Sequence, residues 1–214
     1  MAFSIRKFVL LEILFFVVFA LGTKALALEW IPKYAGPITL ILTLVVLTLY
    51  MRRQGRTWAN YGLKPLEGIK PKLMVIPQAF LVSIGFVVAV GTVLVLANVF
   101  QISALLEVSE GIEGRFGEVR GNLPKFLMWL GIIWVSAAFG EEMFFRGYLI
   151  TRLQEALPRS RLATIIAVLI PALIFGYGHY HYQGFRGLVT LSGNVIFERF
   201  KISIWDGVFF CCLG

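Results

Sequence analysis

The sequence is poor in charged residues and nearly devoid of cysteine and histidine. Asp, Glu, Lys and Arg together make up 15% of the 214 residues, against about 25% in a soluble globular domain. So little polar surface cannot coat a water-soluble globule, which excludes a soluble enzyme and a disordered chain. The two cysteines, Cys211 and Cys212, are adjacent. A disulfide between neighbours is strained, so a disulfide-built scaffold is excluded as well.

Long apolar runs take the place of the missing charge. Apolar residues make up 58% of the chain and gather in six runs separated by polar segments. The runs cover residues 8–28, 35–51, 73–100, 123–156, 162–179 and, more weakly, 188–197 together with 202–214. A membrane-spanning segment must satisfy its backbone hydrogen bonds internally, and the alternating pattern of a membrane β-barrel is missing here. The sequence therefore predicts an all-α fold, a polytopic transmembrane bundle of about six helices.

The first apolar run has two interpretations. It follows two basic residues, and Ala25-Leu26-Ala27 resembles a signal-peptidase site, so residues 1–27 could be a cleaved signal peptide. The run is long for the apolar part of a signal peptide, which favours a retained membrane anchor. Two charged residues, Glu12 and Lys24, interrupt this run.

Basic residues mark one side of the membrane. They precede the first run, dominate residues 52–72 and follow the fourth run, whereas the polar segment 101–122 carries four Glu and two Arg. The positive-inside rule then predicts a cytoplasmic N-terminus and an external 101–122 segment. The net charge of +8 does not gather on one amphipathic face. We therefore expect membrane lipid as a partner and no nucleic acid.

Two adjacent carboxylates, Glu141 and Glu142, lie inside the fourth run. A charge near the bilayer centre costs about 2.5–3.5 kcal/mol on insertion scales, so such residues usually face the bundle interior and have partners. Glu142 and Arg146 are four residues apart, close enough on a helix to form an ion pair. Glu141 then points about 100° away from Glu142. A carboxylate in such a dry site suits a general base.

The only two histidines, His179 and His181, lie at the end of the fifth run. Gly176 and Gly178 precede them and allow another helix or a substrate to approach closely. A glutamate and a histidine from neighbouring helices form a suitable water-activating pair. His181 is the weaker candidate of the two histidines.

The two motifs together resemble the CPBP family, which contains the CAAX prenyl endopeptidases and related bacteriocin-processing and self-immunity membrane proteins. The resemblance rests on Glu-Glu-x-x-x-Arg at Glu141, Glu142 and Arg146, followed by Phe-x-x-x-His at Phe175 and His179. It covers less than half of the chain. It implies an intramembrane glutamate-dependent endopeptidase that hydrolyses a peptide bond near the membrane.

The resemblance also implies a role for each residue. Glu141 would activate water and His179 would assist, while Glu142 and Arg146 would form a supporting ion pair. The substrate would be a peptide or protein C-terminus. We expect neither a metal nor another cofactor, since an H-E-x-x-H pattern is missing and the family resemblance argues against a metal. The family's distribution and the chain's size suggest a bacterial inner membrane.

The resemblance divides a single membrane domain, residues 1–214, into N-terminal helices over 1–122 and a motif-bearing core over 123–214. The family carries a further His-x-x-x-Asn-like motif in a later helix, where it is thought to stabilise an oxyanion. Here the His would fall near Cys211 and the Asn beyond Gly214, so we expect a core that is incomplete at its C-terminus. Asn194 is only a weak candidate for the missing amide.

The expected loss of this motif leaves alternative functions open. Removing one oxyanion donor typically costs about 10²–10³ in rate. The protein would then be an impaired protease or, alternatively, a non-catalytic binding or bacteriocin-immunity protein on the same fold. A small transporter is a third alternative, disfavoured because the chain has no internally repeated halves.

Overall fold

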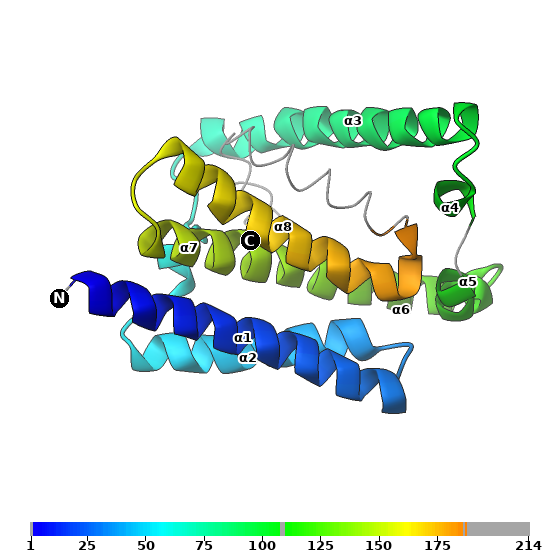
Figure 1. Cartoon of the computed structure of the whole chain (residues 1–214). Coiled ribbons are helices and arrows are strands. Elements are labelled where there is room, and N and C mark those ends of the chain that lie inside the picture. Colours follow the sequence, from blue (N-terminus) through cyan, green and yellow to red (C-terminus); the bar gives the residue numbers. More distant parts are fainter. Residues whose placement is uncertain (1, 108–109, 186, 188–214) are drawn as a thin grey trace. The chain divides into compact units, whose positions relative to one another are not determined.

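The computed structural model describes residues 2–107, 110–185 and 187. Within these ranges every regular element is helical, which confirms the predicted all-α class (Figure 1). The elements are α1 (Ala2–Trp30), α2 (Ala35–Arg53), η1 (Trp58–Tyr61), α3 (Ile69–Val99), α4 (Ser103–Leu106), α5 (Glu110–Phe116), η2 (Gly117–Val119), α6 (Leu123–Ile133), η3 (Trp134–Ile150), α7 (Thr151–Ala156) and α8 (Arg161–Gln183).

Five helical stretches in the described part of the chain are long and apolar enough to cross a membrane. They are Arg6–Trp30, Ala35–Arg53, Ile69–Val99, Leu123–Ala156 and Arg161–Tyr180. Each coincides with one of the first five apolar runs, so the chain is a multi-pass membrane protein. The sixth run, residues 188–214, lies outside the described residues, as do Asn194 and the place of the expected third motif.

The helices form two compact units. The first contains residues 1–61 and 113–171, and the second contains residues 62–112 and 172–214. The boundary falls within α8, after Pro171, so this helix begins in the first unit and ends in the second.

In the first unit, α1 packs against α2 and α7, and α2 also packs against η3. Figure 1 shows α1 and α2 side by side as a helical hairpin. The contact face of α1 follows the helical repeat, because Val9, Ile13 and Phe16 are buried while Leu11 and Phe15 are exposed. Exposed apolar side chains on a spanning helix are suited to contact lipid. The buried core is Val9, Ile13, Phe16, Leu47, Met51, Tyr61, Phe144, Tyr148, Leu149, Leu153, Ala156 and Ala167.

The fourth span changes its helical geometry along its length. It begins as α6, continues as a π-helix through η3 and returns to α-helix in α7. Two glycines allow close packing of η3. A Cβ atom on Gly140 would lie 3.0 Å from the Leu40 side chain, and one on Gly147 would lie 3.2 Å from the Tyr61 carbonyl oxygen. π-Helical turns are rare in proteins, and those that occur are often found at functional sites.

The second unit contains α3 and the C-terminal half of α8. Large apolar side chains of α3, among them Leu73, Phe80 and Leu81, are exposed. On a spanning helix these side chains are suited to face lipid. The short helix α4 packs against α3.

Candidate active site

Glu141 lies in the middle of the fourth span. The span runs from Leu123 to Ala156, so Glu141 is eighteen residues from its start and fifteen from its end. Its side chain is half-buried on η3.

Arg146 is paired with the second of the two adjacent carboxylates. Its Nη1 donates to Oε2 of Glu142 at 2.5 Å, across one turn of η3. The two side chains are 15% and 26% exposed. Both charges also act electrostatically on Glu141. The arrangement places two carboxylates and one guanidinium together at the centre of a membrane span.

Lys24 of α1 belongs to the same charged group, although the sequence motifs do not include it. Its charge and that of Glu141 act on each other, and its side chain is half-buried. The signal in the sequence is a lysine interrupting an apolar run. An ionisable residue inside a membrane span usually has a partner and a function.

His179 lies near the end of α8, in the second unit. Its Nδ1 donates to the carbonyl oxygen of Phe175 at 3.0 Å, and the two rings are 4.2 Å apart between centroids. A carbonyl can only accept, so the neutral ring carries its proton on Nδ1 and presents Nε2 as an acceptor. The Phe-x-x-x-His spacing is thus a local device that orients the imidazole.

The chain returns to His179 immediately after α8. Gly184 has a φ of +58°, and the backbone N–H of Gly187 donates to its carbonyl at 3.0 Å. A Cβ atom on Gly187 would lie 2.7 Å from the backbone carbonyl of His179. Only glycine permits this approach, a requirement that sequence spacing alone does not reveal.

The predicted pairing of Glu141 with His179 joins residues of different units, the first and the second respectively. It remains a prediction. The side chain of His181 lies outside the described residues, as does Asn194. Among the residues that are described, no three His, Cys, Asp or Glu side chains gather to form a metal-binding group.

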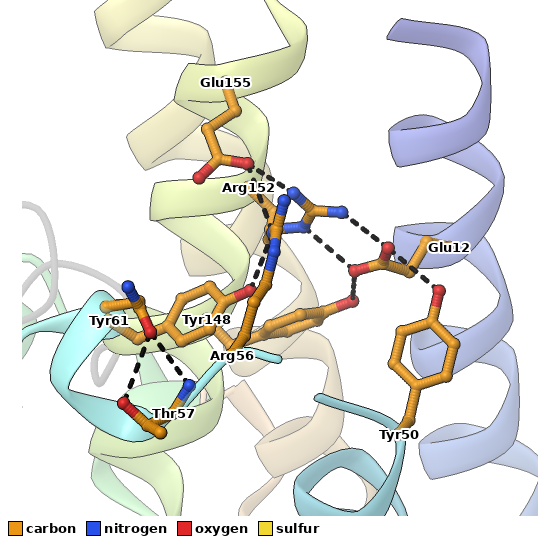
Figure 2. A network of polar contacts seen from close by, with 9 residues as sticks. Glu12, Tyr50, Arg56, Thr57, Tyr61, Tyr148, Arg152 and Glu155 are labelled. Atoms are coloured by element: carbon orange, nitrogen blue, oxygen red, sulfur yellow. Dashed lines mark hydrogen bonds and ion pairs between the residues drawn. The ribbon is translucent and has the colours of Figure 1, made fainter. Parts of the chain in front are cut away.

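A second charged cluster, also in the first unit, is built around Glu12 of α1 (Figure 2). Glu12 Oε1 accepts from Tyr148 at 2.8 Å and from Arg152 Nε at 2.9 Å. Its Oε2 accepts from Tyr50 at 3.0 Å and from Arg152 Nη2 at 2.5 Å. Arg152 also pairs with Glu155, which faces Arg56. The Glu12 and Arg152 side chains are only 3% and 2% exposed.

Comparison with known protein families gives one match for the segment that contains these residues. Residues 123–212 match the family model of the type II CAAX prenyl endopeptidase Rce1-like proteins. This segment is Rce1-like. The resemblance expected from the two motifs is thereby confirmed, because Glu141, Glu142, Arg146, Phe175 and His179 all lie in the matched segment. Searches among curated proteins and among solved structures gave no match.

The match of residues 123–212 bears on the type of activity. It supports protease activity of the CAAX type within a membrane, and proteases of this family act on peptide or protein substrates there. The five candidate spans in the described part of the chain support a multi-pass membrane protein.

Proposed function

We propose that this protein is an intramembrane endopeptidase in which Glu141 activates water and His179 assists. The observation that carries the proposal is the position of Glu141. It lies at the centre of a membrane span, inside the Rce1-like segment, beside a carboxylate that already pairs with Arg146. The distribution of basic residues favours a cytoplasmic N-terminus, and we propose a bacterial inner membrane as the location.

The proposed reaction moves one proton through the site. Glu141 accepts a proton from water as the water oxygen attacks the carbonyl carbon of the scissile peptide bond. The C–N bond then breaks, and the proton is delivered to the leaving amine nitrogen. His179, with Nδ1 fixed by Phe175, presents Nε2 to hydrogen-bond the water or the leaving group. A carboxylate and an imidazole suffice for these transfers, so we propose that the reaction uses no metal.

The ion pair between Glu142 and Arg146 has a supporting role in this proposal. It holds Arg146 on Glu142 at 2.5 Å, so the second carboxylate is neutralised within its own helix turn. In this proposal Glu141 is the carboxylate that acts on water.

The proposal is tested by comparing Glu141→Gln with the wild type in the cleavage of a prenylated CAAX peptide in proteoliposomes. The amide keeps the shape of the side chain but cannot accept the proton, so we expect cleavage to fall by about 10²–10⁴. Glu118→Gln is the matched control, because Glu118 lies outside the spans and is exposed; it should cleave at the wild-type rate.

Retained cleavage in folded Glu141→Gln protein would contradict the proposed mechanism. Absence of cleavage in the wild type, together with a biological function that survives Glu141→Gln, would instead support the alternative of a binding or bacteriocin-immunity protein. His179→Gln should also lower cleavage, and unchanged cleavage in that variant would remove His179 from the reaction.

A further inference from the structure

Lys24 lies on the face of α1 that packs into the first unit. It follows Ile13 by eleven residues and Val17 by seven, so all three lie within about 20–40° of one another around the helix. Ile13 is buried and Val17 packs against the core. The half-buried Lys24 side chain therefore extends from the packed face of α1 and not from the lipid-facing side.

Contacts at both ends align α1 with the fourth span. Toward the N-terminus of α1, Glu12 forms an ion pair with Arg152. Beyond its C-terminus, Lys33 forms an ion pair with Glu118, just before the fourth span begins. Since the first contact joins the start of α1 to the end of the fourth span, the two segments run antiparallel.

This alignment brings Lys24 and Glu141 to a similar depth. Lys24 lies twelve residues beyond Glu12, about 18 Å along an α-helix. Glu141 lies eleven residues before Arg152, which is at most about 16 Å. The four-carbon stem of lysine can bridge the remaining offset. The mutual electrostatic action of the two side chains agrees with this estimate.

Charge counting explains why a lysine belongs at this depth. With both carboxyl groups ionised, two carboxylates and one guanidinium would leave an excess negative charge in a medium where uncompensated charge is costly. Arg146 neutralises Glu142, and Lys24 supplies the second cation. Arg115 is the further charged group that acts on Lys24. The α2 side chains packed on Gly140 are Leu40 and Leu44, which are apolar.

We propose that Lys24 is a positioning residue for the reaction, a counter-charge that favours the ionised form of Glu141 and orients its carboxylate toward the water. This inference rests on the proposed function, because it assigns Lys24 a role in supporting the general base. Lys24 itself does not need to touch the substrate.

The first test compares Lys24→Met with Lys24→Arg in the cleavage of a prenylated CAAX peptide across a range of pH. A cation favours the ionised form of a nearby carboxyl group. Loss of the charge in Lys24→Met should therefore move the acidic limb of the pH–rate profile upward by about one pH unit or more. Lys24→Arg keeps the charge and should keep the wild-type profile. Lys7→Met, on the exposed start of α1, is the matched control.

A second test needs no activity. Cysteines replacing Lys24 and Glu141, with Cys211 and Cys212 changed to serine, should be joined by a short bifunctional maleimide in intact membranes. A pair that replaces Lys7 and Glu141 is the control and should not be joined. Absence of the Lys24–Glu141 cross-link would overturn the inference.

The two tests separate the failure of this inference from the failure of the proposed function. A Glu141→Gln variant that loses cleavage, beside a Lys24→Met variant whose profile is unmoved, overturns the role of Lys24 and leaves the protease intact. A Glu141→Gln variant that still cleaves overturns the proposed function. A cross-link formed in that case shows that the failure lies in the chemistry and not in the Lys24–Glu141 placement.

Discussion

Two glutamate–arginine ion pairs in the first unit differ in burial and in the helices they join. The Glu12–Arg152 pair joins helices that are distant in sequence and is almost fully buried, with 3% and 2% exposure. The Glu142–Arg146 pair lies within one turn of η3 and is partly accessible, with 26% and 15% exposure. The first pair holds distant helices together, whereas the second belongs to the charged group for which we propose a catalytic role.

The number of hydrogen bonds that each carboxylate accepts accounts for the difference. Each carboxylate oxygen of Glu12 accepts two hydrogen bonds, one from a tyrosine and one from the Arg152 guanidinium. A bidentate pair with its remaining lone pairs satisfied can withstand burial. In the other cluster Arg146 pairs with Glu142 across one turn of η3, and Glu141 is the adjacent carboxyl group. In the proposed reaction, this second carboxyl group is the one that acts on water.

The largest expected effect is on stability, from changing the arginine of each pair to methionine. Arg152→Met leaves the Glu12 carboxylate buried without its cation, and should lower the free energy of unfolding by about 3–5 kcal/mol. Arg146→Met should cost clearly less, because Glu142 is partly accessible. Thermal unfolding of the detergent-solubilised variants measures both. Equal losses of stability in the two variants would show that the two ion pairs contribute equally to the fold.

A smaller effect is expected where the π-helix meets α2. Gly140→Ala places a methyl group 3.0 Å from the flexible end of the Leu40 side chain, which should cost about 1 kcal/mol as that side chain moves. Gly131→Ala is the matched control in α6, because nothing lies within 4 Å of its added Cβ. That control should be stabilised by about 0.5–1 kcal/mol, as alanine favours a helix. Equal shifts in the two unfolding temperatures would contradict close packing at Gly140.

The smallest effect is expected at an exposed cluster outside the membrane. Lys125 donates to Glu118 at 2.7 Å and Lys33 does so at 3.4 Å, and these hydrogen bonds hold the pKa of Glu118 below its usual value. A lowered pKa adds stability that is present above the unfolded-state pKa and is lost as the pH falls through the folded-state value. Wild type should therefore lose slightly more stability on acidification than Glu118→Gln.

Unfolding temperatures of the two proteins at neutral and acidic pH measure this difference. High salt should abolish it, because exposed charges are screened. A difference that survives in high salt would show that the Glu118 cluster is shielded from solvent.

Much of the fold could be predicted from the sequence because it depends on local properties. The length and apolarity of each run predict the five spans, since a helix satisfies its backbone hydrogen bonds within the segment. The i,i+4 spacing of Glu142 and Arg146 predicts their ion pair for the same reason. Phe175 and His179 lie one turn apart and come into contact by that spacing alone.

The partners of the isolated charges could not be predicted, because they come from distant parts of the chain. Glu12 and Lys24 interrupt one apolar run, yet the first pairs with Arg152, 140 residues away, and the second acts on Glu141. Many helix packings would satisfy the same apolar runs. The observed packing aligns the start of α1 with the end of the fourth span.

The sequence by itself determined the helices, their membrane character and the two motifs that place residues 123–212 in an Rce1-like segment. The tertiary structure alone decided that Glu12 is buried with hydrogen-bond partners from α2, η3 and α7, and that Lys24 of α1 acts electrostatically on Glu141. The physical reason is that hydrogen bonding within a helix is local, whereas neutralising a charge in an apolar medium requires a partner from whichever helix packs beside it.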